Sequence, residues 1–346
     1  MMAVVFQGQG KISVEQAPIP QVREGTVLMK VKAAAICATD LRIFRGEKNA
    51  KQNVVLGHEF AGVVAEIGEG VKEIGLGERL GFYPVIADGR CDYCVRGFRN
   101  RCVNRKTAGI DLDGGFAEYF LIPEDAIRLG NCTRLPDNVS YEEAALLEPI
   151  STVINSVEKL EIGYGDNVLI VGAGPMGLLH VMLSRLRGAA NIIVSDPVDE
   201  RLVKAKELGA TETINPRTQK LSEAIDAQVG EAGVNKAVLT VGVPDVVEQL
   251  LEIVQPQGKI SLFAGGGQTY RSSVDLNRIH YKELTLTATQ NATLEHFKKG
   301  LRMVAGGSLD VNKLITHRFP LENAIEAFSL RDELKALKVL LIPQTP

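Results

Sequence analysis

Three of the five cysteines fall close together in the segment DGRCDYCVRGFRNRC, residues 88–102. Cys91, Cys94 and Cys102 have the spacing C-x2-C-x7-C, and thiolates at such short spacing are typical zinc ligands. A structural zinc site needs four ligands, so this stretch supplies three and leaves the fourth to be found. An odd number of cysteines with one cluster favours metal binding or a free thiol over a disulfide framework.

A second set of side chains with metal-binding atoms is spread over the first half of the chain. Cys37 stands in ICATDLRIF, His58 and Glu59 stand in LGHEFAG, and Glu148 stands in LLEPIST. None of them is diagnostic alone, because a lone cysteine in an apolar stretch is more often a core residue. Together they offer a thiolate, an imidazole and two carboxylates, which are donors that zinc accepts.

A glycine motif occurs near the middle of the chain. The segment VGAGPMG places Gly172, Gly174 and Gly177 in the spacing G-x-G-x-x-G, with Pro175 and Met176 inside it. An apolar strand pattern precedes the motif and a helical pattern follows, which is the context of a dinucleotide-binding turn. The glycines would allow the tight turn, the close approach of a pyrophosphate, and the packing of the helix on the sheet. The competing interpretation is a structural glycine turn.

An acidic residue follows the motif at the distance that cofactor binding requires. Asp196 lies 19 residues after Gly177, at the end of the next apolar run. Its carboxylate can accept hydrogen bonds from both ribose hydroxyls and would repel a 2′-phosphate, so NAD is favoured over NADP. Arg201 leaves NADP open, because a nearby arginine can hold that phosphate.

The elements that must position these residues change in character along the chain. Up to residue 150, short apolar runs separated by glycine turns predict a mostly-β domain. From 151 to 287, strands alternate with helices, which predicts a doubly wound parallel sheet, an α/β Rossmann fold. Residues 288–346 contain two helical patterns and a final strand, and we expect them to return to the first domain.

Composition excludes several classes of function. The 346 residues carry 39 basic and 42 acidic side chains, a net charge of −3, so no basic surplus indicates nucleic acid or a membrane surface. The first residues do not resemble a signal peptide, and no apolar run is long enough to cross a bilayer. We therefore expect a cytoplasmic protein.

The motifs, taken in order, resemble those of the zinc-dependent medium-chain dehydrogenases. The shared features are Cys-x-Thr-Asp, Gly-His-Glu, the short-spaced cysteines, Glu-Pro and the glycine motif, and they extend over essentially the whole chain. Glu148 stands where typical alcohol dehydrogenases carry a cysteine, which resembles the polyol (sorbitol-type) branch. The resemblance implies a GroES-like catalytic domain from residues 1–150 and 288–346, with the Rossmann domain at 151–287.

The resemblance also implies roles at a catalytic zinc. Cys37 and His58 would be ligands, and Glu59 and Glu148 would compete for the third protein position. Asp40 would orient His58.

Three further residues would serve substrate and cofactor. Thr39 would begin a proton relay from the substrate hydroxyl. Thr152 would lie beside the nicotinamide, and Val241 would line the cofactor site.

The family's structural zinc lobe follows the pattern C-x2-C-x2-C-x7-C. Laid on this chain, its first position falls on Asp88, ahead of Cys91, Cys94 and Cys102. A carboxylate oxygen is an acceptable zinc ligand, so we expect a structural site of one aspartate and three cysteines. The alternative is a loop that has lost its metal and keeps three reduced thiols.

These inferences predict an enzyme that transfers hydride from a secondary alcohol, a polyol or sugar acid, to NAD and yields a ketone. The alternatives are a sugar-alcohol-phosphate or threonine dehydrogenase and, less favoured, a non-catalytic dinucleotide-binding protein. Arg42, Arg45 and Lys48 could meet a carboxylate or phosphate, or form a solvated basic face. The resemblance further implies a homodimer or homotetramer.

Overall fold

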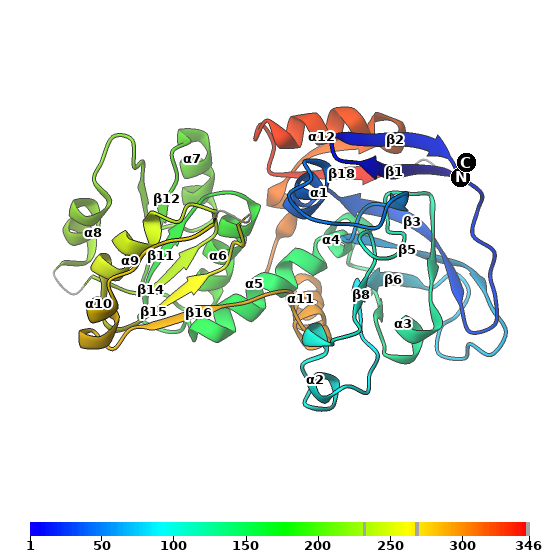
Figure 1. Ribbon diagram of the computed structural model, residues 1–346, viewed down its shortest axis with the longest axis horizontal. Coiled ribbons are helices and arrows are strands. Elements are labelled where there is room, and N and C mark those ends of the chain that lie inside the picture. The colour runs from blue at the N-terminus through cyan, green and yellow to red at the C-terminus, as the bar shows by residue number, and fades with distance from the viewer. Residues whose placement is uncertain (231–232, 267–269, 344–346) are drawn as a thin grey trace. The chain divides into compact units, whose positions relative to one another are not determined.

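The computed structural model describes residues 1–230, 233–266 and 270–343. The chain divides into two compact units (Figure 1), Met1–Ser151 with Ala292–Pro346, and Thr152–Asn291. The sequence placed these two boundaries at 150/151 and 287/288. Helix α5 (Leu147–Leu160) carries the first boundary.

The first unit is built on β-sheets. Its seven-stranded sheet has the order β10-β6-β5-β3-β18-β17, with β9 also paired to β3. These strands are β3 (Val27–Ala35), β5 (Phe60–Ile67), β6 (Arg79–Phe82), β9 (Tyr119–Ile122), β10 (Cys132–Arg134), β17 (Ile315–Pro320) and β18 (Lys338–Ile342). The smaller sheets contain β1 (Met2–Gly8), β2 (Lys11–Gln16) and β4 (Val54–Val55), and β7 (Val85–Ile86) with β8 (Lys106–Thr107).

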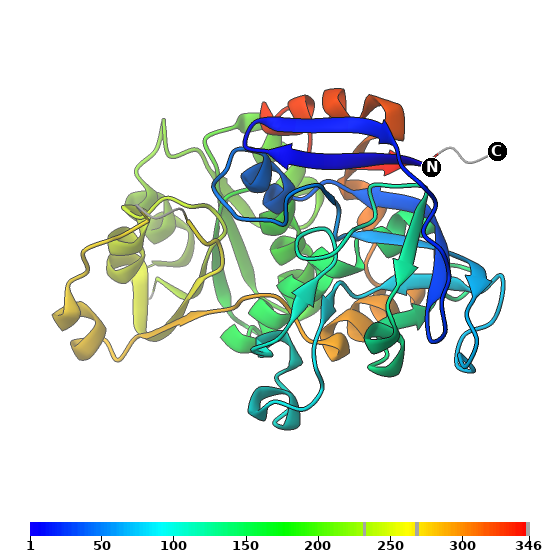
Figure 2. The ribbon, with the colours of Figure 1, turned by 45° about the vertical axis from the view of Figure 1, so that its right-hand side comes forward.

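The C-terminal segment completes the first unit. Strand β18 pairs antiparallel with β3, and its apolar residues are buried. In Figures 1 and 2 the red C-terminal segment lies among the blue N-terminal strands. Phe60, Phe82 and Phe120 form the aromatic centre of the core, with ring centroids 4.8 to 5.3 Å apart. Residues from the N-terminal and the C-terminal parts of the chain therefore build one domain.

The helices of the first unit are mostly short. They are α1 (Ala38–Phe44), α2 (Asp92–Val95), α3 (Glu124–Arg128), α4 (Tyr141–Ala145), α11 (Leu294–Ala305) and α12 (Ala324–Asp332), with the 3-10 turns η1 (Arg99–Arg101), η3 (Val311–Leu314) and η4 (Leu321–Asn323). Helix α4 begins at a capping box in which Ser140 accepts from the Glu143 N–H and Glu143 accepts from the Ser140 N–H.

The second unit is a six-stranded parallel sheet with the order β13-β12-β11-β14-β15-β16. Its strands are β11 (Asn167–Val171), β12 (Asn191–Ser195), β13 (Glu212–Ile214), β14 (Val234–Leu239), β15 (Val254–Leu262) and β16 (Thr285–Ala288). Its further helices are α6 (Pro175–Leu186), α7 (Asp199–Glu207), α8 (Leu221–Val229), α9 (Val246–Ile253) and α10 (Leu276–Tyr281), which flank the sheet in Figure 1.

The apolar composition of the central strands explains this sheet. In β12, Ile192, Ile193 and Val194 are all fully buried, as expected for a strand covered on both faces. The strand order is that of a doubly wound dinucleotide-binding fold. The predicted fold class, a Rossmann unit with a mostly-β GroES-like unit, is confirmed. Within the described residues, no helix combines the length and hydropathy that a bilayer span requires.

Candidate active site

Cys37, His58 and Glu59 come together at one end of the large sheet of the first unit. Cys37 is the N-cap of α1, directly after β3, and His58 and Glu59 directly precede β5. Strands β3 and β5 are antiparallel, and the Ala35 N–H donates to the Glu59 carbonyl at 2.8 Å. The metal-binding atoms of the three side chains all lie within 4.8 Å of one another. The sheet register therefore gathers a thiol, an imidazole and a carboxylate.

Asp40 lies behind this cluster and contacts two of its members. Asp40 is fully buried, its Oδ2 accepts from the Cys37 N–H at 2.8 Å, and its Oδ1 lies 3.3 Å from His58 Nδ1. Burial lowers the pKa of His58, but the Asp40 carboxylate and the Cys37 thiol outweigh it and raise this pKa well above its ordinary value. The surroundings of His58 therefore favour a positive charge at this place, which a bound metal ion would also supply.

Glu59 has one carboxylate oxygen paired and one unpaired. The side chain is fully buried, and Oε2 accepts from the Lys338 ammonium of β18. Among the described residues, Oε1 has no hydrogen-bond partner. A buried carboxylate oxygen is costly when it is left unsatisfied, so a cation beside Cys37 and His58 fits this arrangement. The sequence analysis missed Lys338, although a lysine inside the apolar run ALKVLLI was a usable signal.

Glu148 is near this cluster but not part of it. It lies at the start of α5, half-buried, and is not among the side chains whose metal-binding atoms gather within 4.8 Å. Burial raises the pKa of Glu148 to about 7, with His58 lowering it and Glu59 raising it further. Of the two glutamates that the sequence left in competition, Glu59 is the one that lies beside Cys37 and His58.

The structure places the three residues predicted to serve substrate and cofactor on or next to separate elements. Thr39 is half-buried in the first turn of α1, between Cys37 and Asp40. Thr152 is half-buried on α5, and Val241 is half-buried just after β14.

The four residues of the predicted structural zinc site form a second cluster. The metal-binding atoms of Asp88, Cys91, Cys94 and Cys102 all lie within 4.8 Å of one another. Cys91 Sγ and Cys94 Sγ are 3.5 Å apart, and the Asp88 N–H donates to Cys102 Sγ at 3.3 Å. One carboxylate and three cysteine sulfurs in this arrangement match the donor set of a structural zinc site.

Hydrogen bonds hold the Asp88 carboxylate in place. Its Oδ1 accepts from the N–H groups of Arg90 and Cys91 at 2.9 and 3.1 Å, and its Oδ2 accepts from Asn104 Nδ2 at 2.8 Å. The Arg90 N–H, Asn104 and the Cys91 N–H hold the pKa of Asp88 well below its usual range. The carboxylate is therefore ionised, as a metal ligand must be. Nothing in the sequence singled out Asn104.

The glycine motif forms the turn between β11 and α6. A Cβ on Gly172, which has φ +100°, would lie 2.5 Å from Thr240 Oγ1, and one on Gly177 would lie 1.8 Å from the Gly172 carbonyl oxygen. A Cβ on Gly174 would meet nothing within 4 Å, so the space beside this backbone is open to a ligand. Pro175 occupies the first turn of α6, where no N–H is needed. Each glycine thus meets the steric demand of a pyrophosphate-binding turn.

Asp196 follows β12 and is almost fully buried. Its Oδ2 accepts from the Ala173 N–H at 2.7 Å, and its Oδ1 accepts from the Val198 N–H at 2.9 Å. From the sequence we expect this carboxylate to accept hydrogen bonds from both ribose hydroxyls, and in the structure each of its oxygens already holds one backbone N–H. A carboxylate oxygen has a second lone pair, so contact with ribose is still open to both. Arg201 is half-buried on α7.

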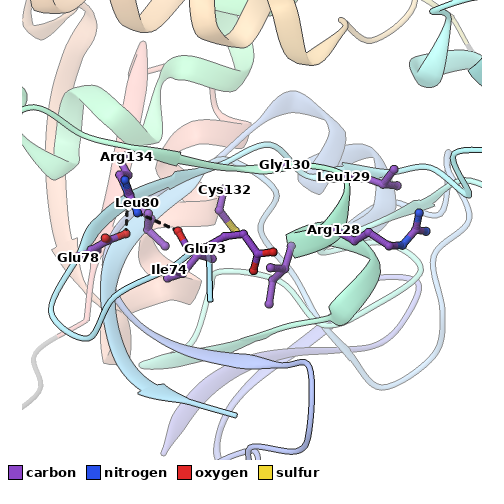
Figure 3. Close-up of a pocket in the computed structure, with 10 residues that line it drawn as sticks. Glu73, Ile74, Glu78, Leu80, Arg128, Leu129, Gly130, Cys132 and Arg134 are labelled. Carbon is purple, nitrogen blue, oxygen red and sulfur yellow. Dashed lines mark hydrogen bonds and ion pairs between the residues drawn. The ribbon is translucent and has the colours of Figure 1, made fainter. Parts of the chain in front are cut away.

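A separate pocket of about 350 Å³ in the first unit contains none of the predicted site residues (Figure 3). Cys132 lines it, and Arg134 Nε donates to Glu78 Oε2 at 2.9 Å on its rim. Burial raises the pKa of Cys132 to about 12, so this thiol stays protonated and unreactive near neutral pH.

Comparison with known proteins identifies the family of this chain. The family models "Alcohol dehydrogenase GroES-like domain" and "Zinc-binding dehydrogenase" match residues 23–136 and 175–306. A sorbitol dehydrogenase of Bacillus subtilis (strain 168) is 32% identical, over 99% of this chain and 97% of that protein. An L-threonine 3-dehydrogenase of Pyrococcus horikoshii is 35% identical, over 94% of this chain and 93% of that protein. A solved structure from Sinorhizobium meliloti 1021, bound to NADP, has a TM-score of 0.93 and 32% identity over 99% of both chains. The chain therefore belongs to the zinc-dependent medium-chain dehydrogenases, is polyol-dehydrogenase-like, and is an alcohol oxidoreductase.

Proposed function

We propose that this protein oxidises a secondary alcohol, a polyol or sugar acid, to a ketone with NAD as the hydride acceptor. The observation that carries the proposal is the cluster of Cys37, His58 and Glu59, in which the buried Glu59 Oε1 has no partner among the described residues. A zinc ion held there would lower the pKa of a nearby hydroxyl, and a nicotinamide would accept the hydride.

The protein's own residues have distinct tasks in this proposal. Cys37, His58 and Glu59 hold the metal, while Asp40 fixes the ring of His58 and the backbone of Cys37. The Thr39 hydroxyl takes the proton from the substrate hydroxyl and passes it outward. Its place in the first turn of α1, two residues from Cys37, supports this task.

We assign the cofactor site to the glycine turn and to Asp196. The open space at Gly174 and the free N–H groups at the start of α6 suit a pyrophosphate. The buried carboxylate of Asp196 supports NAD, because it would repel a 2′-phosphate. Steady-state kinetics with NAD and with NADP test this assignment.

The basic residues Arg42, Arg45 and Lys48, in and just after α1, narrow the substrate class. Arg45 contacts Asp332, and Arg42 lies 3.6 Å from Glu47, so both are already neutralised. Lys48 forms no ion pair within the described part of the chain. Its positive charge acts to lower the pKa of Glu148. The Lys48 ammonium could therefore pair with the carboxylate of a substrate such as a sugar acid.

A substrate screen tests the proposed function as a whole. Zinc-loaded protein is mixed with NAD and with polyols, sugar acids, phosphorylated polyols and threonine in turn, and NADH formation is followed by absorbance. We expect turnover of a polyol or sugar acid. If only threonine or only a phosphorylated polyol is oxidised, the proposed substrate class is wrong and that compound takes its place. If none of these compounds is oxidised, the result contradicts the proposed function.

We further propose that the chain forms a homo-oligomer through the edge of its parallel sheet. Among the described residues, strand β16 pairs with β15 alone and so presents an unpaired edge. Light scattering after size-exclusion chromatography measures the oligomeric state.

A further inference from the structure

Lys338 forms a buried ion pair with a candidate zinc ligand that is distant in sequence. The lysine is 2% exposed and Glu59 is 0% exposed, and the Lys338 ammonium contacts Glu59 Oε2. A lysine is almost never buried unless it is paired. Its position in a strand whose other residues are apolar therefore requires an explanation.

The strand register explains how Lys338 reaches this place. In the antiparallel pair of β18 and β3, Leu340 lies opposite Ala35, and the Ile36 N–H donates to the Val339 carbonyl at 2.9 Å. The same register, continued to the next residue, sets Lys338 opposite Cys37. The C-terminal strand thus delivers an ammonium group to the segment that carries the cluster.

We propose that Lys338 is a positioning residue that acts on the metal through Glu59. By holding Oε2, it leaves Oε1, which has no hydrogen-bond partner among the described residues, available to a metal bound by Cys37 and His58. This inference rests on the zinc site proposed above.

Charge gives the physical reason for a lysine at this position. Glu59, Asp40 and Cys37 place up to three negative charges in a buried space. Without a partner, a buried carboxylate would be strongly destabilising. The ion pair with Lys338 supplies that partner on Oε2 and fixes the orientation of the Glu59 carboxylate before the metal arrives.

The test measures how fast zinc leaves the site. Zinc-loaded wild type, Lys338→Met, Lys338→Arg, Glu59→Gln and Lys338→Met/Glu59→Gln are mixed with a chromogenic chelator. We expect Lys338→Met to release this zinc about 10 to 100 times faster than wild type, the usual effect of losing a partner of a metal ligand. Lys338→Arg should restore most of the retention. In the Glu59→Gln background, Lys338→Met should have no further effect, because Lys338 acts through Glu59.

Two control variants separate the ways in which the test can fail. Cys37→Ser identifies which zinc fraction belongs to this site, and if it loses no zinc, the proposed zinc site itself is wrong. Lys282→Met removes a lysine that donates to the carbonyls of Leu251, Glu252 and Val254 in the second unit, and should alter stability without altering zinc release.

Two results would overturn the role of Lys338 alone. One is wild-type zinc retention in Lys338→Met. The other is an equal acceleration by Lys338→Met in the wild-type and Glu59→Gln backgrounds, which indicates a purely structural lysine. If Lys338→Met does not fold, Lys338→Gln removes the same charge, and the same comparison with the same expected result applies.

Discussion

Asp196 Oδ2 accepts a hydrogen bond from the Ala173 N–H at 2.7 Å, which ties the end of β12 to the glycine turn after β11. The same carboxylate accepts from the Val198 N–H through Oδ1. One buried side chain therefore shapes the pyrophosphate turn and also presents negative charge where the ribose is expected. In the proposed cofactor site, the choice between NAD and NADP and the stability of the turn would therefore both depend on this residue.

Asp196→Ala should weaken the preference for NAD. A hydrogen bond to a charged group is worth about 1.5–3 kcal/mol, so the ratio of kcat/KM for NAD over NADP should fall by roughly 10 to 100 times. The unfolding temperature should also fall, because two backbone N–H groups lose their acceptor. The exposed Glu200, changed to alanine, is the matched control. An unchanged cofactor ratio in Asp196→Ala would remove Asp196 from the proposed ribose contact.

Asp88→Ala should release the zinc of the lobe and leave the catalytic zinc in place. Zinc content should fall from about two to about one per chain, and the unfolding temperature should fall with it, because a structural zinc contributes directly to folding. Elemental analysis and thermal unfolding measure the two effects. Asp92→Ala, an exposed acidic residue in the same lobe, should change neither. Full zinc content in Asp88→Ala would show that the aspartate is not a ligand.

Asp40→Asn should weaken zinc binding by Cys37, His58 and Glu59 without changing the arrangement of these side chains. It removes the charge that faces His58 while keeping an oxygen for the Cys37 N–H, so we expect a loss of about 10 to 100 times in zinc affinity or activity. Zinc titration and kcat measure the effect. Asp275→Asn changes the residue that caps α10 and should leave zinc affinity alone. Equal behaviour of the two variants would contradict an orienting role for Asp40.

His180 should make stability depend on pH in the acid range. Burial lowers its pKa from 6.5 to about 4, and its Nδ1–H donates to the Met176 carbonyl at 2.8 Å. As pH falls below 6.5, the unfolded state takes up a proton that the folded state refuses until about pH 4. Stability should therefore fall over this window by up to about 1.4 kcal/mol per pH unit.

His180→Gln tests this dependence. In zinc-free protein, the variant should lose less stability than wild type between pH 6.5 and pH 4, as measured by urea unfolding. His280→Gln, at an exposed position, should follow the wild-type curve. Parallel curves for wild type and His180→Gln would show that the buried histidine does not control acid stability.

Lys48→Ala should discriminate between charged and neutral substrates. A partly exposed charge pair is worth up to about 1 kcal/mol, so KM for a carboxylated or phosphorylated alcohol should rise by roughly fivefold. KM for a neutral polyol should not change. Arg45→Ala removes a cation already paired with Asp332 and serves as the control. A uniform rise in KM for all substrates would argue against an anion contact.

The sequence alone was sufficient for the features that depend on local spacing. The glycine turn, the cysteine lobe with Asp88 and the alternation of strands and helices are encoded within short segments, where spacing determines which side chains share a turn or a face. The fold class and the family follow from these segments, and the structure and the comparisons confirm both.

The tertiary structure decided the relationships that depend on strand pairing across the chain. The antiparallel register of β3 with β5 and β18 places Glu59, rather than Glu148, beside Cys37 and His58, and sets Lys338 against Glu59. Packing also showed that the two Asp196 oxygens already hold backbone N–H groups. Such contacts join residues far apart in sequence, and their geometry depends on register and burial, which no local spacing encodes.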